Sequence, residues 1–324
     1  MHPSYSVIFF TTASGAGYGL LSLLGIFNAL GLLPESPWFG FASLSSALIL
    51  ITAGLLSSTF HLGHPERAWR ALSQWRTSWL SREGIASVVT YIPAGLFSVG
   101  WIYLEQTHGI WSLFGLFASL GAALTVYCTG MIYASLKAIP AWNHKLVAPG
   151  YVLLGLATGA VLLNVLLLLF GAFVISVLIV ALFALVAGLL LKYRYWHSID
   201  GAHDVSTVGT ATGLGDRVKV LDPPHTSTNY LQTEMGFKIA RRHAEKLRTM
   251  TLVALFALPL SLAAGILFFP SLGIVLGIAS VLSAGLALSL SVGFFSPRPN
   301  TWCHSITKDE VTGEREFCTR MKIV

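Results

Sequence analysis

The chain has 324 residues, of which 54% are hydrophobic and only 10% are charged. A soluble domain usually carries roughly 25% charged residues, so the composition excludes an ordinary soluble protein and indicates one that lies in a lipid bilayer. The formal net charge is +6, but no basic stripe is interleaved with aromatic residues. We therefore attribute the excess of positive charge to membrane topology and contact with membrane lipid, and we expect no nucleic-acid partner.

Eight stretches are apolar over the roughly 20 residues that a membrane-spanning helix needs. They are 6–32, 38–60, 84–104, 110–136, 148–170, 172–191, 249–269 and 272–295. The predicted fold is an all-α membrane protein, in which 1–324 form a single domain with a bundle of eight transmembrane helices. The start of the chain has neither a basic segment nor a small-residue cleavage site, so we expect the first stretch to be a span and not a signal peptide.

Basic residues lie on one side of the predicted bundle. All 20 Lys and Arg residues fall in four segments on the side of the N-terminus, namely 61–83, 137–147, 192–248 and 296–324. The short connections on the other side contain Glu35 and Glu105 and no basic residue. By the positive-inside rule, both termini are predicted to be cytoplasmic, in a bacterial inner membrane. The prediction includes a long cytoplasmic loop between spans six and seven, and a cytoplasmic tail.

The predicted spans contain few groups that carry charge or bind a metal. All 14 acidic residues fall in loops or at span ends, which argues against a stand-alone transporter, although transport through broken helices stays open as a weaker alternative. None of the ten histidines lies in the middle of a span, so we expect no haem. The three cysteines have no metal-ligand spacing, and no metal site is expected. Gly15, Gly17 and Gly19 predict close packing of the first span.

The sequence HLGHPERAWRAL at 61–72 gathers charged residues where the second span ends. Pro65 is predicted to begin a helix that lies along the interface, with its two tryptophans at the depth of the lipid headgroups. Ser81 is then predicted to cap the third span, with Glu83 in its first turn. We therefore expect the whole segment 61–83 to form a cytoplasmic interfacial segment.

Four arginines, two histidines and two acids within these 23 residues exceed what anchoring to lipid needs. Taken singly, each is more readily explained as a phosphate anchor, a polar terminus or a helix-dipole partner. Taken together, a histidine that titrates near neutral pH beside a carboxylate favours delivery of protons to a lipid-soluble redox molecule. The candidate residues are His61, Arg67, Trp79, Arg82, Glu83 and Tyr133. A second set is His64, Tyr18 and Tyr127, of which the two tyrosines fit an aromatic belt better than a site.

The same stretch, with SWLSREG after it, resembles the hallmark region of DmsC-type membrane anchors, the quinone-facing subunits of dimethyl sulfoxide reductase family complexes. The similarity continues through MIYASLKAIPAWNH at 131–144 and through residues 206–248. The resemblance implies eight spans, no haem, and a quinone, either ubiquinone or menaquinone, bound at the anchor. It also implies direct contact with an iron–sulfur electron-transfer subunit, and a catalytic subunit that carries molybdopterin.

The resemblance assigns roles to individual residues. The histidine of the family's H-L-G-x-P motif, which is implicated in quinone binding, falls on His61, and the family's acidic residue falls on Glu83. His64 occupies the variable position of the motif, so no role for it is implied. The chain itself is expected to hold no catalytic residue, because the substrate chemistry belongs to another subunit.

Within the family, the chain looks most like the anchor of membrane-bound sulfite-oxidising enzymes, because its motif side is predicted to face the cytoplasm. This implies that electrons pass from sulfite through the iron–sulfur subunit to quinone. The reverse flow remains an alternative, in which quinol is oxidised to reduce a sulfoxide, a polysulfide or a related acceptor. The loop 192–248 is predicted to dock the iron–sulfur subunit, against the alternative of a solvated connector.

Overall fold

The computed structural model describes residues 5–59, 65–137, 142–200, 213 and 244–289, and every structural statement below concerns these residues. All regular elements among them are helices, so the predicted all-α class is confirmed for this part of the chain. In sequence order they are α1 (Tyr5–Ala29), α2 (Pro37–Thr59), η1 (Pro65–Gln74), α3 (Trp79–Ile102), α4 (Ile110–Ala134), α5 (Val147–Leu169), α6 (Ile175–Asp200), α10 (Ala244–Thr251), η2 (Leu252–Ala257), α11 (Leu258–Phe268), η3 (Pro270–Leu272) and α12 (Gly273–Ser289).

Seven helices in the described part of the chain are long and apolar enough to cross a membrane. They match the first seven predicted spans, and the seventh runs from Arg248 to Phe268 through η2 and α11. The eighth predicted span corresponds to α12, which is apolar but has 17 described residues, fewer than the roughly 20 that a bilayer needs. Its predicted end at 295 and the tail 296–324 lie outside the described residues, so the eighth span stays a prediction.

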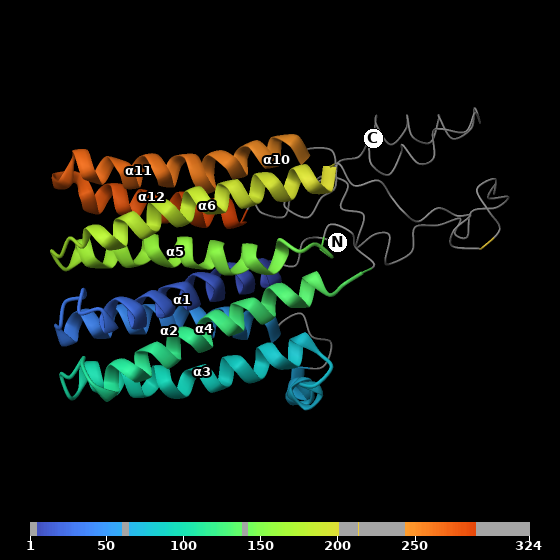
Figure 1. Ribbon diagram of the computed structural model, residues 1–324, viewed down its shortest axis with the longest axis horizontal. Helices are drawn as coiled ribbons and strands as arrows, with labels where there is room; N and C mark the ends of the chain where they lie inside the picture. Colours follow the sequence, from blue (N-terminus) through green and yellow to red (C-terminus); the bar gives the residue numbers. More distant parts are fainter. Residues whose placement is uncertain (1–4, 60–64, 138–141, 201–212, 214–243, 290–324) are drawn as a thin grey trace.

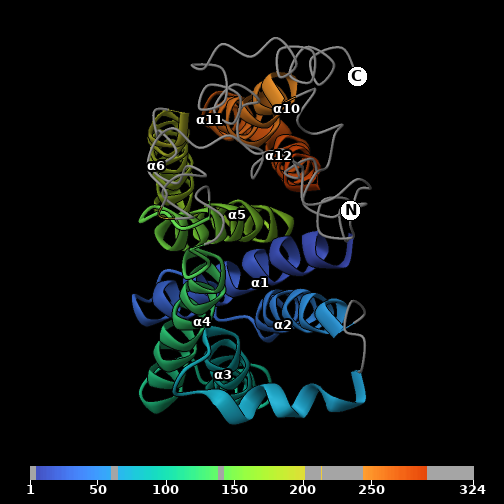
Figure 2. The ribbon, with the colours of Figure 1, turned by 90° about the vertical axis from the view of Figure 1, so that its right-hand side faces the viewer.

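The long helices lie side by side with their axes nearly parallel (Figure 1). The central helix α1 packs against α2, α4 and α5. On one side of it α3 packs against α4, and on the other α5 packs against α6 and α12 (Figure 2). The bundle therefore has two halves, α1–α4 and α5–α12, which meet where α1 and α4 pack against α5. One apolar core runs through both halves and includes the fully buried side chains of Leu20, Leu24, Phe97 and Leu163.

Glycines let α1 approach its neighbours closely. A Cβ added at Gly19 would overlap the carbonyl group of Gly155 on α5, and one added at Gly17 would lie 2.8 Å from the carbonyl oxygen of Ala47 on α2. Lipid supplies no hydrophobic force between spans, so such close backbone packing is what holds them together. The packing predicted from glycine spacing is confirmed at these two positions. At Gly15 an added Cβ would meet no atom within 4 Å, but the carbonyl oxygen of Gly15 lies 3.1 Å from the position that a Cβ of Gly155 would take.

The start of α3 differs from the sequence prediction. The helix begins at Trp79 and is capped by Ser78, whose hydroxyl oxygen accepts the backbone N–H of Ser81 at 3.5 Å. The predicted cap at Ser81 is therefore wrong, because the helix extends upstream by more than one residue and Ser78 supplies the cap. Glu83 is consequently the fifth residue of α3 and lies inside the span, where its side chain is buried.

The end of α6 also differs from the prediction. Hydropathy predicts that the sixth span ends at 191, but α6 continues to Asp200. The extension is stabilised by Tyr195 and Trp196, which are buried against η2 in a cluster with Leu255 and Phe256. The first part of the predicted loop 192–248 is therefore helical, and Lys192 belongs to a span.

The seventh span contains a π-helical turn, η2. Pro259 has no backbone N–H, so the carbonyl four residues before it cannot receive the usual helical hydrogen bond. The N–H of Leu258 bonds instead to the carbonyl of Val253, five residues back, which widens the turn. This turn places the buried ring of Phe256 against Gly188 of α6, at 3.2 Å from the position that a Cβ would take.

The interfacial segment is a 3-10 helix, η1, and not the regular α-helix expected from its spacing. It runs across the end of the bundle, transverse to the spans (Figures 1 and 2). Trp69 and Trp75 are exposed, and the guanidinium groups of Arg70 and Arg76 lie 5.6 and 5.4 Å from their respective ring centroids. These exposed aromatic and basic groups are typical of a segment at the headgroup level.

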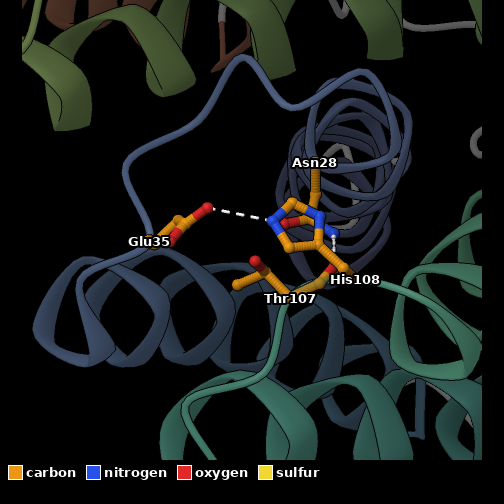
Figure 3. A network of polar contacts seen from close by, with 4 residues as sticks. All are labelled: Asn28, Glu35, Thr107 and His108. Atoms are coloured by element: carbon orange, nitrogen blue, oxygen red, sulfur yellow. Dashed lines mark hydrogen bonds and ion pairs between the residues drawn. The ribbon is translucent and has the colours of Figure 1, made fainter.

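The opposite end of the bundle is joined by a small polar network (Figure 3). The amide of Asn28, at the end of α1, donates a hydrogen bond of 2.8 Å to the carbonyl of Thr107. Nε2 of His108 lies 2.9 Å from Oε1 of Glu35, and both side chains are largely exposed. These contacts tie the α1–α2 connection to the α3–α4 connection, so we assign them a structural role.

Candidate functional site

Glu83 is a buried acid in a membrane-spanning helix. Glu83 is 4% exposed, and the hydroxyl of Thr129 on α4 donates a hydrogen bond of 2.5 Å to Oε1 of Glu83. Burying a carboxyl group in an apolar bundle is costly unless hydrogen bonds compensate. Ionisable groups that are kept at such positions are by default functional. The sequence predicts Glu83 at a span end, and the structure places it deeper.

The Thr129 hydroxyl has two oxygen neighbours. Besides Glu83, it lies 3.0 Å from the backbone carbonyl of Thr125, one turn earlier on α4. A hydroxyl has one proton to donate and two lone pairs that accept. It can therefore donate a hydrogen bond to an ionised Glu83, or accept a hydrogen bond from a protonated Glu83 while donating its own to the Thr125 carbonyl. Either charge state of Glu83 finds a partner in Thr129, which is what a proton-exchanging group needs.

A pocket with a cavity volume of about 120 Å³ opens beside this pair, between α1, α4, α5 and α6. Thr129 lines the pocket, so one residue contacts both the pocket and Glu83. Most of the lining is apolar or glycine, and Gly15 leaves open space at one wall. The remaining polar groups include Thr11, Ser14, Tyr151, Lys192 and Tyr195. A mostly apolar pocket with a few convergent polar groups is typical of a small-molecule site.

Tyr133 contacts this pocket through its neighbour. Its ring stacks on Tyr151, a lining residue, with centroids 5.5 Å apart and planes 14° from parallel. The ring of Trp142 packs edge-on against its other side at 5.3 Å. The structure therefore brings Tyr133 close to the pocket, although Tyr133 does not itself line it.

The two tyrosines of the second candidate set, Tyr18 and Tyr127, lie in different environments. Tyr18 is 2% exposed and packs in the core, so its expected place in an aromatic belt is wrong. Its hydroxyl lies beside the side chains of Ser87 and Thr125. Tyr127 is exposed and packs edge-on against Trp79 at 6.2 Å, which fits a belt.

The candidate arginines point away from Glu83. Arg82 donates hydrogen bonds to the carbonyls of Trp75 and Arg76 at 3.0 and 2.8 Å, and its guanidinium lies 4.2 Å from the ring centroid of Trp79. Arg67 is exposed and lies 3.8 Å from Glu66. These two arginines therefore belong to the surface formed by η1 and the start of α3, and neither lines the pocket. His61 and His64 lie outside the described residues.

Sequence reasoning missed several polar residues of the pocket, among them Thr129, Tyr151, Lys192 and Tyr195. Lys192 and Tyr195 fall in a predicted loop because charge interrupts the apolar run at 192. A helical pattern continuing through KYRYW, with aromatic residues three and four positions after Lys192, was the available signal.

The C-terminal end of α6 carries a further polar group. The guanidinium of Arg248 binds Asp200 through two hydrogen bonds, of 2.7 and 3.1 Å, and lies 5.4 Å from the ring centroid of Trp196. Because both side chains of the pair are mostly buried, this contact fixes the start of the seventh span to the end of α6.

His144 lies on the α4–α5 connection, next to the pocket residue Tyr195. The two rings pack edge-on with centroids 5.5 Å apart. The backbone N–H of Leu146 donates to Nδ1, so the neutral ring carries its proton on Nε2, which lies 3.0 Å from the hydroxyl of Ser198. Burial, and then the charge of Lys145, lower the pKa of His144 below its ordinary value. Among the described residues, no cluster of His, Cys, Asp or Glu is able to hold a metal ion.

The long apolar helices of the bundle define a multi-pass membrane protein, and the pocket beside the buried acid is its candidate functional site. The chain belongs to the DMSO reductase anchor subunit (DmsC) family, whose family model matches residues 1–269. The resemblance stated from the sequence is thereby confirmed. Anchors of this family work in complexes with catalytic and iron–sulfur subunits, so the chain is a subunit of an oxidoreductase complex.

Two curated relatives are similar to the chain. A sulfite dehydrogenase subunit of Allochromatium vinosum is 33% identical over 288 residues, which cover 81% of this chain and 86% of the relative. A polypeptide of the anaerobic dimethyl sulfoxide reductase of Haemophilus influenzae is 27% identical over 99 residues, which cover 31% of this chain and 35% of the relative. No solved structure matches the chain significantly.

Proposed function

We propose that this anchor binds quinone in the pocket between α1, α4, α5 and α6 and passes electrons to it from an iron–sulfur subunit during cytoplasmic sulfite oxidation. In the catalytic subunit, sulfite and water give sulfate, two protons and two electrons. The two electrons leave through the iron–sulfur clusters, and with two protons they convert one quinone to quinol. The molybdopterin and the clusters belong to the partner subunits.

One observation carries this proposal: the pocket is lined by Thr129, whose hydroxyl is hydrogen-bonded to the buried Glu83. Quinone reduction requires an apolar cavity for the ring and a group that supplies protons to its oxygen atoms. The apolar walls meet the first requirement. Glu83, with Thr129 between it and the cavity, meets the second.

The residues of the chain then have distinct roles. Thr129 donates a hydrogen bond to a quinone oxygen and exchanges that proton with Glu83. His61, which the family motif implicates in quinone binding, is proposed to relay protons from the cytoplasm to Glu83. Arg67 and Arg82 are proposed to bind lipid phosphates at the interface, because both lie on the surface formed by η1 and the start of α3.

We further propose that the pocket end of the bundle faces the cytoplasm of a bacterial inner membrane. All described Lys and Arg residues lie at this end or in the connections beside it, and the opposite connections contain only Glu35 and Glu105 as charged residues other than histidine. Protons consumed at the pocket then come from the cytoplasm, so this site alone generates no charge gradient. The part of loop 192–248 beyond Asp200, which lies outside the described residues, is proposed to dock the iron–sulfur subunit.

Filling the pocket tests the proposed function. A Cβ added at Gly15 meets no atom within 4 Å, and Gly15 lines the pocket, so we expect Gly15→Phe to place its ring in the cavity. In the assembled complex we expect sulfite-dependent reduction of decylubiquinone to fall by at least about tenfold, since the ring occupies the ligand's space. Sulfite oxidation with an artificial acceptor that takes electrons from the partner subunits should be unchanged.

Gly95→Phe is the matched control. Gly95 is an exposed glycine of α3 that also has no atom within 4 Å of an added Cβ, but it does not line the pocket. Its quinone activity should equal that of the wild type. Equal quinone activity in the Gly15 and Gly95 variants would mean that quinone binds elsewhere.

The second candidate function is electron transfer in the reverse direction, from quinol to an acceptor. It is favoured by the similarity to a polypeptide of a dimethyl sulfoxide reductase, although this covers only 31% of the chain. A complex of that kind would oxidise quinol at the same pocket and reduce a sulfoxide or a polysulfide. Measuring quinol-dependent reduction of these acceptors beside sulfite-dependent quinone reduction distinguishes the two directions.

A further inference from the structure

A second polar group faces the pocket from the half of the bundle opposite to Glu83. Lys192 lies on α6 and lines the same cavity as Thr129 on α4. Gly188, four residues earlier, and Tyr195, three residues later, line it as well, so this face of α6 forms one wall. The cavity therefore has a hydroxyl backed by an acid on one wall and an ammonium group on another.

The Lys192 side chain is held in position by aromatic rings. Its ammonium nitrogen lies 4.7 Å from the ring centroid of Tyr195 and 5.4 Å from that of Trp196. Such cation–π contacts stabilise a cation where water is scarce. The structure thus places the Lys192 amino group at the cavity wall, beside aromatic rings that restrict its movement.

The chemistry of these two walls matches a ligand with two acceptor oxygens at opposite ends of a flat ring. An ammonium group carries three donors and no acceptor, so it binds a carbonyl oxygen. Its positive charge stabilises negative charge that develops on that oxygen as electrons arrive, and this stabilisation is larger in an apolar site than in water. A neutral hydroxyl has no positive charge with which to stabilise negative charge on the other carbonyl oxygen.

We propose that Lys192 is the second quinone-binding residue, and that its ammonium group hydrogen-bonds the carbonyl oxygen remote from Thr129. The quinone ring then spans the join between the two halves of the bundle. The two protons that complete the quinol reach one oxygen through Glu83 and Thr129 and the other through Lys192, which regains its own proton from the cytoplasmic side. This assignment rests on the proposed function, because it places a residue in the same site.

Three variants of the assembled complex test the assignment. Lys192→Met removes the charge and keeps the length of the side chain, so the specificity constant kcat/KM for decylubiquinone should fall roughly 10- to 100-fold, as expected for a lost charged hydrogen bond. Lys192→Arg keeps a cationic donor and should restore most of the activity. Lys246→Met removes an exposed cation of α10 and should have no effect. Sulfite oxidation with an artificial acceptor should be equal in all three.

The possible results separate the two proposals. If Lys192→Met retains wild-type quinone kinetics while Gly15→Phe abolishes them, quinone binds in the pocket and the role of Lys192 is refuted. If Gly15→Phe also has no effect, the proposed function itself fails. If the Lys192→Met complex does not assemble, the wild-type complex can instead be labelled with a photoreactive azidoquinone. Labelling of the peptide 188–195, suppressed by excess decylubiquinone, supports the assignment, and labelling confined to other helices refutes it.

Discussion

Replacing Thr129 by Val isolates the hydrogen bond that connects the pocket to Glu83. The two side chains have nearly the same shape, so the change removes a hydroxyl without leaving a cavity. Thr129 is 6% exposed and Glu83 is 4% exposed, so water does not readily take the place of the lost donor. An unsatisfied buried polar group costs about 1–3 kcal/mol, and we expect the free energy of unfolding to fall by this amount.

Thr90→Val provides the matched control. Thr90 is also a buried threonine of the α3–α4 pair, and its hydroxyl donates only to the carbonyl of Ala86 in its own helix, at 2.7 Å. The backbone of α3 already satisfies that carbonyl, so we expect a loss below about 1 kcal/mol. The free energies can be measured by titrating the protein in dodecyl maltoside micelles with sodium dodecyl sulfate.

Quinone activity supplies the second measurement. General acid–base catalysis contributes about 100-fold or more, so Glu83→Gln should lower kcat for quinone reduction by that factor in the assembled complex. Thr129→Val should lower kcat by less, because Glu83 remains. If both residues lie on one proton path, the double variant should be no slower than Glu83→Gln alone. Additive losses, or a Thr129 variant that matches the Thr90 control in both assays, would refute the proposed connection.

Three further predictions concern the frame around the pocket. Gly19→Ala should prevent stable assembly, because its Cβ would overlap the carbonyl of Gly155; yields of folded protein measure this. Arg248→Met should destabilise the protein by about 3–5 kcal/mol in the same micelle titration, since it leaves the carboxylate of Asp200 mostly buried without its cation, and adding Asp200→Asn should recover part of the loss. The pKa of His144 is lower in the folded than in the unfolded state, so the unfolded state binds its proton more readily. Stability should therefore decline as the pH falls below about 6.5, and His144→Gln should reduce that decline.

Hydropathy was sufficient to predict the helices that are apolar over their whole length. Spans such as α2 and α4 are apolar over their whole length, and their predicted bounds lie within two residues of the helix ends. Hydropathy predicts the wrong helix end where packing or capping, and not apolar composition, extends the helix. Lys192 interrupts the apolar run of α6, yet Tyr195 and Trp196 are buried and extend the helix to Asp200.

The candidate site was predictable only in part, for a related reason. A cluster of charged residues close together in sequence drew attention to Glu83, and burial of Glu83 in α3 agrees with a functional role. The same clustering drew attention to Arg67 and Arg82, which lie on the surface formed by η1 and the start of α3. Thr129 and Lys192 come from distant parts of the sequence and carry no local signal, so only the packing of α4 and α6 around one cavity brings them together.

The position of the cavity has a consequence for how the anchor works. Glu83 and Thr129 belong to the half formed by α1–α4, and Lys192 belongs to the half formed by α5–α12. A ligand held by both walls stabilises the join between the halves, where α1 and α4 pack against α5 and where the backbones of Gly19 and Gly155 approach closely. Binding of quinone should therefore raise the unfolding midpoint of the wild type in micelles. Because Lys192→Met removes one of the two contacts, it should reduce this increase even where the basal midpoint is unchanged.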